Sequence, residues 1–240
     1  MAKFFIAGTN LFGGAASVSI EDELRLRALR LFRGETFTVR TGGTDYRCRA
    51  EGLKGGFDTE VLSETPIPEE PGRFCSLYTA FFKDDKMDAV VRQGTELGVS
   101  QFVVFPTANS PGPGKAALLC ALAGWRKIAA DTAASAGRRI IPAITVVSDF
   151  SAAVALASGA ELSLFLNERE VSRSIGEALQ TKPDAKTVSV LLGPEEGFDS
   201  GEAEEASRTM LSVTLGPRVL FCDTAAAAAV SAVMSAAEHP

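Results

Sequence analysis

A glycine-rich turn at residues 192–198, Leu-Gly-Pro-Glu-Glu-Gly-Phe, has the composition of a ligand-binding loop. It follows an apolar run that predicts a buried strand, and the spacing of Asp199 and Glu202 predicts a capping box at the start of a helix. Gly193 and Gly197 allow a ligand to approach the backbone closely. Because the two glutamates between them would repel a phosphate, the loop favours a neutral or cationic ligand over ATP or NAD. A plain strand-to-helix turn without a ligand is the alternative.

Two further loops also follow predicted strands. Residues 106–114 contain the run Pro-Thr-Ala-Asn-Ser followed by Pro-Gly-Pro-Gly. Residues 215–225 contain a Gly-Pro turn, and Asp223 and Thr224 stand where a helix N-cap belongs. Ligands of open parallel sheets bind beyond the carboxyl ends of the strands, so we expect the three loops to meet at one edge of a sheet. The alanines after Thr224 are explained by helix propensity alone.

Composition limits the chemistry that these loops can perform. The chain has 240 residues, of which 46% are hydrophobic and 22% charged, as is usual for one large or two modest globular domains. The only histidine, His239, stands next to the last residue of the sequence, which argues strongly against a histidine-based triad or a multi-histidine metal site. The four cysteines form no CxxC pair, which argues against zinc and disulfides and suits a reducing cytosol; they are Cys48, Cys75, Cys120 and Cys222.

No apolar run approaches the ~20 residues of a membrane span, and the first 20 residues lack the pattern of a signal peptide. We therefore expect a cytoplasmic protein without a membrane partner. The net charge is −6, yet residues 25–54 contain eight basic residues against three acidic ones, a local net charge of +5. Arginines predominate in this segment, and arginine pairs bidentately with phosphate. The candidate RNA-binding residues are Arg25, Arg27, Arg30, Arg33, Arg47 and Arg49. A solvated basic face balanced by the acids at 21–23 is the alternative.

Two composition regimes predict two domains. Residues 1–73 contain short alternating stretches punctuated by glycine pairs, which predict a small β-rich domain, and residues 65–72 form a proline-rich extended connector. Residues 74–240 alternate strand and helix patterns, which predict an α/β domain with a mainly parallel sheet. Strands are expected at 75–80, 101–106, 140–147, 162–166, 187–192 and 212–215. Helices are expected at 84–97, 118–129, 150–157, 172–180, 203–210 and 224–237.

Short motifs in a fixed order run through almost the whole chain. They are Arg-Ala-Leu-Arg-Leu at 27–31, Thr-Glu-Leu-Gly-Val at 95–99, Trp125 with Arg138, Gly-Pro-Glu at 193–195, and Leu-Gly-Pro-Arg-Val-Leu at 215–220 followed by Thr-Ala at 224–225. Together they resemble the RsmE-type ribosomal RNA uridine-N3 methyltransferases of the SPOUT superfamily. The resemblance implies a PUA-like β-barrel domain for RNA binding at 1–73 and an α/β domain with a trefoil knot at 74–240. It also implies a homodimer and a small-subunit (16S) ribosomal RNA substrate.

The resemblance implies S-adenosylmethionine as methyl donor, held between the loops without metal. The implied cofactor-binding residues are Leu166, Leu192, Gly193, Pro194, Gly197, Leu215, Gly216, Leu220, Thr224 and Ala225. Arg218 and Arg138 are candidates for stabilising the uridine anion or anchoring phosphate, and Glu195 is a candidate base. A sulfonium donor without phosphates agrees with the acidic character of the 192–198 loop.

Several residues of the family pattern, most of them polar, are replaced in this chain. The replacements are Ala108, Asn109, Ser135, Glu196 and Phe221, the last of which stands where the family has an arginine. They leave open a second hypothesis, a catalytically weakened paralogue that binds ribosomal RNA or a ribosomal subunit without methylating it. A third hypothesis is an unrelated α/β enzyme that acts on a small molecule.

Overall fold

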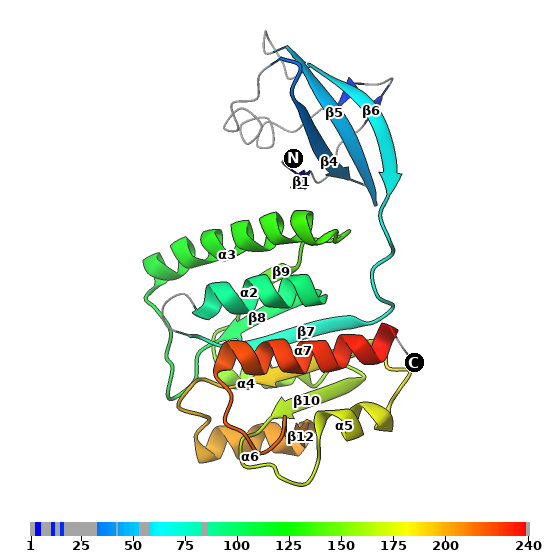
Figure 1. Cartoon of the computed structure of the whole chain (residues 1–240). Helices are drawn as coiled ribbons and strands as arrows, with labels where there is room; N and C mark the ends of the chain where they lie inside the picture. Colours follow the sequence, from blue (N-terminus) through cyan, green and yellow to red (C-terminus); the bar gives the residue numbers. More distant parts are fainter. Residues whose placement is uncertain are drawn as a thin grey trace. The chain divides into compact units, whose positions relative to one another are not determined.

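The computed structural model of the protein describes residues 3–5, 11–12, 15–16, 33–41, 43–52, 58–82 and 86–238. The chain forms two compact units, one of residues 1–70 with 133–140, the other of residues 71–132 with 141–240. Figure 1 gives the element labels used below. Three of the arginines expected to bind RNA, Arg25, Arg27 and Arg30, lie outside the described residues.

The first unit is built on a four-stranded sheet in the order β1-β4-β5-β6. Its strands are β1 (Lys3–Phe5), β4 (Thr36–Thr41), β5 (Thr44–Gly52) and β6 (Asp58–Pro66), and β2 (Leu11–Phe12) pairs separately with β3 (Ala15–Ala16). β4, β5 and β6 are antiparallel neighbours, and β1 runs parallel to β4. Alternate residues of β4 and β5 enter a small core of Phe37, Val39, Cys48 and Ala50. The prediction of a β-rich N-terminal region is confirmed for these strands.

A buried arginine lies on the other side of β4. The Arg40 guanidinium forms two hydrogen bonds of 2.7 Å to the Asp45 carboxylate, its neighbour across the β4–β5 pair. It also donates to the carbonyl oxygens of Ala133 (3.1 Å) and Ala134 (2.9 Å), in the last turn of helix α3 (Lys115–Ala136). A cation at a helix C-terminus satisfies carbonyls that have no partner within the helix and complements the helix dipole.

The second unit contains a six-stranded sheet in the order β12-β10-β11-β7-β8-β9. Its strands are β7 (Phe74–Ala80), β8 (Gln101–Phe105), β9 (Ala143–Val146), β10 (Leu162–Leu166), β11 (Thr187–Leu192) and β12 (Leu211–Val213). Every pairing within this sheet is parallel. The central strands are buried almost from end to end, as expected where helices cover both faces. The α/β prediction is thereby confirmed, and three elements (150–157, 162–166 and 187–192) have the predicted bounds.

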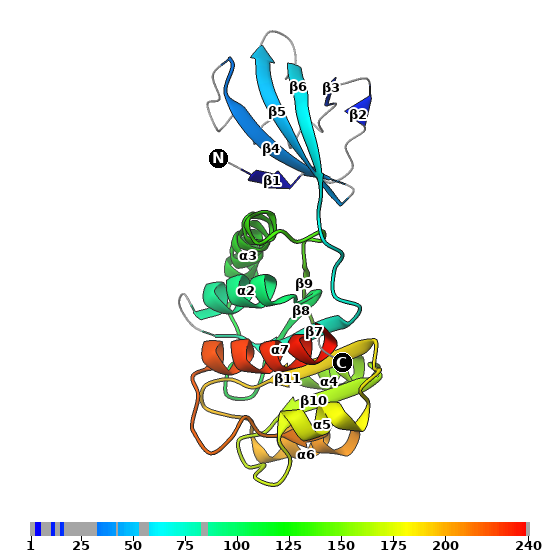
Figure 2. The same ribbon diagram turned by 45° about the vertical axis from the view of Figure 1, so that its right-hand side comes forward.

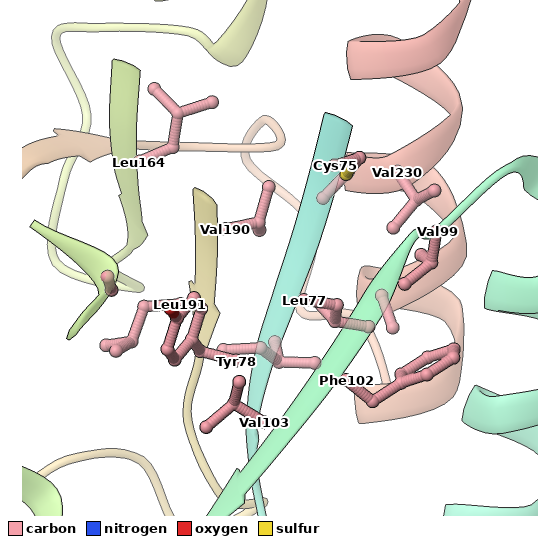
Figure 3. Close-up of a cluster of buried hydrophobic side chains, with 14 of the residues drawn as sticks. Cys75, Leu77, Tyr78, Val99, Phe102, Val103, Leu164, Val190, Leu191 and Val230 are labelled. Carbon is pink, nitrogen blue, oxygen red and sulfur yellow. The ribbon is translucent and has the colours of Figure 1, made fainter. Parts of the chain in front are cut away.

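Helices cover the sheet on both sides. They are α2 (Lys86–Leu97), α3, α4 (Phe150–Ala157), α5 (Ile175–Thr181), α6 (Ser200–Thr209) and α7 (Cys222–Glu238). α7 packs on β7 and β11 together with α2, whereas α4 contacts the same strands and packs with α6 (Figure 2). Figure 3 shows the resulting core, in which Cys75 and Leu77 of β7 lie with Val230 of α7 and Phe102 of β8. This core fixes the strand ends from which the loops emerge.

Replacing Arg40 by alanine is expected to destabilise the first unit by about 3–5 kcal/mol, because it removes a buried guanidinium that pairs with the Asp45 carboxylate and donates to two helix-end carbonyls. Chemical denaturation followed by circular dichroism measures the change. Arg49→Ala is the matched control, since its ion pair with Glu60 is exposed and contributes less than about 1 kcal/mol. Equal losses of stability in the two variants would contradict a stabilising role of the buried Arg40 contacts.

Candidate functional site

A cavity of about 510 Å³ lies at the carboxyl ends of three adjacent strands, β10, β11 and β12. Residues 166–171 after β10, residues 192–198 after β11 and residues 213–220 after β12 form most of its wall. Ala203 of α6 and, at the start of α7, Cys222 and Ala225 complete it. The cavity is therefore where open parallel sheets bind their ligands.

The loop after β11 is held by aromatic packing. The Phe198 ring lies with its centroid 5.4 Å from that of Phe150 and 5.2 Å from that of Phe165. A Cβ atom added to Gly193 would lie 2.5 Å from this ring, so only glycine fits there. Gly197 has φ +75°, and a Cβ atom there would lie 2.5 Å from the Glu168 carboxylate. Both glycines predicted to permit close approach are thus required by the loop itself.

The capping box predicted at Asp199 and Glu202 is confirmed: Asp199 accepts a hydrogen bond from the Glu202 amide, and Glu202 accepts one from the Asp199 amide. The other carboxylate oxygen of Glu202 accepts a hydrogen bond of 2.8 Å from the Ala108 amide. The Asn109 side chain donates to the Gly197 carbonyl at 2.9 Å. Hydrogen bonds from the 106–114 loop therefore hold the 192–198 loop and the start of α6 in place.

The 106–114 loop meets the 192–198 loop at one edge of the sheet, as expected, but none of its residues lines this cavity. Its place in the wall is taken by the segment Asn167-Glu168-Arg169-Glu170-Val171, which the sequence analysis missed apart from its predecessor Leu166. The reason is topological: β10 lies between β11 and β12, whereas the 106–114 loop follows β8, on the far side of β7. The signal in the sequence that could have predicted this segment is the polar run of residues 167–170 directly after the apolar strand 162–166.

Charged groups gather at the rim of the cavity. Lys86, the first residue of α2, forms an ion pair with Glu195, and this hydrogen bond raises the pKa of the lysine ammonium. The same ammonium lies 5.7 Å from the centroid of the Phe221 ring. The Cys222 thiol lies 3.6 Å from the Glu195 carboxylate. Burial, and secondarily the nearby carboxylate charge, raises the pKa of Cys222 to about 11.

Nine of the ten residues expected to bind the cofactor line the cavity: Leu166, Leu192, Gly193, Pro194, Gly197, Leu215, Gly216, Leu220 and Ala225. Thr224 is exposed in the first turn of α7 and does not line it. Of the three residues expected to take part in catalysis, Arg218 and Glu195 line the cavity.

The third, Arg138, is placed elsewhere. It belongs to the first unit, where its buried guanidinium pairs with the Glu70 carboxylate at 2.8 Å. Among the arginines expected to bind RNA, Arg33 and Arg47 are exposed, and Arg49 pairs with Glu60 at 2.9 Å. Arg33 and Arg47 thus have accessible guanidinium groups, while that of Arg49 is engaged.

In the described part of the chain, no helix is both long and apolar enough to cross a membrane. The described residues also contain no group of three or more His, Cys, Asp or Glu side chains that could hold a metal ion.

The sequence matches known proteins over most of its length. The sequence model of the family described as RNA methyltransferase domain matches residues 69–234. The protein named ribosomal RNA small subunit methyltransferase E from Aquifex aeolicus is 30% identical, with 87% of this chain and 89% of the relative covered. The protein of the same name from Mycobacterium bovis is 28% identical, with 97% of this chain and 91% of the relative covered.

Two solved structures share the fold across nearly the whole chain. One is a putative methyltransferase from Legionella pneumophila in complex with S-adenosylmethionine, with a TM-score of 0.82, 23% identity and 98% of both chains covered. The other is ribosomal RNA small subunit methyltransferase E from Neisseria gonorrhoeae, bound to S-adenosylmethionine, with a TM-score of 0.78, 21% identity and the same coverage.

The raised pKa of Cys222 predicts slow alkylation. At pH 8 only about one thiol in a thousand is ionised when its pKa is about 11, against about a quarter for an ordinary cysteine. Iodoacetamide labelling followed by mass spectrometry should modify the exposed Cys120 at least about 100-fold faster. Between pH 8 and pH 10 the rate at Cys222 should rise about 100-fold, because the thiolate fraction increases tenfold per pH unit below the pKa. Comparable rates at pH 8 would contradict the burial of the thiol.

Proposed function

The chain belongs to the RNA methyltransferase domain family and, within it, to the ribosomal RNA small subunit methyltransferase E proteins, and from this we propose its reaction. The protein transfers a methyl group from S-adenosylmethionine to N3 of a uridine in small-subunit (16S) ribosomal RNA. The observation that supports this most directly is the cavity at the ends of β10, β11 and β12, lined by nine of the ten residues that the family motifs mark as cofactor contacts.

The cavity fits S-adenosylmethionine in shape and charge. Its volume of about 510 Å³ is that of a small-molecule site, and at Gly193 and Gly197 backbone alone contributes to its wall, because neither residue has a side chain. Three glutamates line the cavity, Glu168, Glu170 and Glu195, against two arginines, Arg169 and Arg218. This acidic excess suits a ligand with a sulfonium cation and no phosphates. When bound, S-adenosylmethionine supplies an electrophilic methyl group.

The residues of the cavity wall would have different roles in cofactor binding and methyl transfer. The backbone of Gly193 and of residues 215–220 would hold the adenosine by hydrogen bonds and apolar contact. Arg218, exposed at the cavity, would stabilise the negative charge that a uracil ring acquires when N3 loses its proton. The Glu195 carboxylate is the candidate base, and its pairing with Lys86 fixes its position at the rim. Arg138 we assign to holding residues 138–140 against Glu70.

The broader organisation is also proposed from the family. Residues 1–73 would form a PUA-like RNA-binding domain, with Arg33 and Arg47 among its phosphate contacts. Residues 74–240 would form a SPOUT domain with a trefoil knot, and the protein would act as a cytoplasmic homodimer. The passage of the chain from the edge strand β12 past the ends of β10 and β11 to α7, which packs on β7 and β11, supports the knot.

Replacing Gly193 by alanine should weaken S-adenosylmethionine binding at least about tenfold. The new methyl group would displace the Phe198 ring, whose packing against Phe150 and Phe165 leaves it little room to move. Isothermal titration calorimetry measures the affinity. Gly176→Ala is the control, because this helical glycine has open space around it and alanine favours a helix. Unchanged affinity in Gly193→Ala would show that S-adenosylmethionine binding does not require the packing of Phe198 against Gly193.

The reaction itself is tested with purified protein, tritiated S-adenosylmethionine and small ribosomal subunits or 16S RNA from cells that lack the methyltransferase. We expect one methyl group per RNA, located at N3 of a uridine by mass spectrometry, and a rate about 10²–10³-fold lower for Arg218→Ala. Binding of cofactor and RNA without methyl transfer would instead support the weakened paralogue. Absence of cofactor binding would overturn the proposal.

A further inference from the structure

We propose that the exposed ring of Phe221 is a stacking platform for the unstacked target pyrimidine at the mouth of the cavity. This inference rests on the proposed methyltransferase function and assigns the nucleobase subsite of the same site. Enzymes that modify a base inside a nucleic acid must take it out of its stack and hold its face against aromatic or apolar side chains. Among the described residues, the exposed Phe221 ring offers such a surface beside the cavity.

Phe221 is unusual in its exposure. Its neighbours Leu220 and Cys222 both line the cavity, and Cys222 is buried, yet the Phe221 side chain is 74% exposed. Val219, which also borders the cavity, is fully exposed in the same loop. An aromatic ring left in water costs free energy that burial elsewhere would recover. Because the Phe221 ring lies at the rim of a ligand cavity, we expect part of the bound substrate to cover it.

A cation from another segment lies over one face of the ring, and a main-chain hydrogen bond holds the backbone that carries the ring. The Lys86 ammonium lies 5.7 Å from the ring centroid and is itself held by the Glu195 carboxylate, which belongs to the cavity wall. The backbone carbonyl of Phe221 accepts a hydrogen bond of 2.8 Å from the Ala225 amide in the first turn of α7. A ring held at one face by a cation remains open at the other, so a base can stack there without rearrangement of the loop.

The chemistry of the ring matches an RNA base better than another apolar partner. Stacking on an aromatic face accepts any base, and the exposed Arg218 guanidinium in the same loop can pair with a phosphate of the strand that carries the base. The resemblance places an arginine at this position in the family, so a phenylalanine here replaces a charged contact by a stacking one. The ring thus selects an unpaired base of RNA held by its face, and the proposed reaction makes that base a pyrimidine.

The test compares Phe221→Ala, Phe221→Trp and the control Leu156→Ala, which removes an exposed apolar side chain from α4. Methylation of 16S RNA by Phe221→Ala should lose about 5- to 150-fold in kcat/KM, the range of one base stack, whereas Phe221→Trp and Leu156→Ala should stay within about threefold of the parent. Affinity for S-adenosylmethionine should change less than twofold in all three, because Phe221 does not line the cavity. An inactive parent protein would defeat the proposed function, and full activity of Phe221→Ala in an active parent would defeat only this inference.

A fluorescence measurement separates stacking from a structural role. The new tryptophan in Phe221→Trp should be quenched by a ten-residue oligouridylate, whereas Leu156→Trp, an equally artificial surface tryptophan, should not respond. The natural Trp125 is buried and provides a constant background. Absence of quenching would overturn the proposal. So would conversion of a dimer to a monomer by Phe221→Ala in light scattering, because the ring would then belong to a contact between copies of the chain.

Discussion

The packing of the Phe198 ring against Gly193 is the contact on which the cavity depends. Ring centroids 5.7 Å, 5.4 Å and 5.2 Å apart link Phe105 to Phe150, Phe150 to Phe198 and Phe198 to Phe165. This series connects the interior of the sheet, through α4, to the loop after β11. A loop without such an anchor would sample many conformations, and ordering it would reduce the free energy of ligand binding. Here the core has already ordered it, so the backbone that faces the ligand is preorganised.

Ala108 and Asn109, which depart from the family pattern, form hydrogen bonds that stabilise this loop. The Ala108 contact with Glu202 uses a main-chain amide, which any residue other than proline could supply. The Asn109 contact with the Gly197 carbonyl uses the side-chain amide. A neutral hydrogen-bond donor therefore stands where the family pattern has a charged residue. The loop geometry can thus survive both replacements. Whatever the replaced charges do in relatives, the shape of the cavity in this chain does not require them.

What the sequence could predict was local. Buried strands, helix periods and the capping box at Asp199 each depend on residues within a few positions, and the structure contains them. The contribution of residues 167–171 depends instead on β10 lying between β11 and β12, a neighbour relation that no local pattern encodes. The same holds for Lys86, which meets Glu195 109 residues later in the chain. Arg138 was expected near the site from a helix motif, but its partner Glu70 lies 68 residues earlier and no spacing rule connects them.

Charge separation explains how a protein with a net charge of −6 can act on RNA. Carboxylates outnumber guanidinium groups by three to two in the cavity wall, which favours a cationic methyl donor over free phosphate. Basic residues concentrate in the segment 25–54, whose exposed members Arg33 and Arg47 can pair with phosphates. Since fields in water at physiological salt fade within about 8 Å, each ligand responds to the groups beside it and not to the sum. The acidic total is therefore compatible with RNA binding, provided that the donor cavity and the phosphate contacts are formed by different segments of the chain.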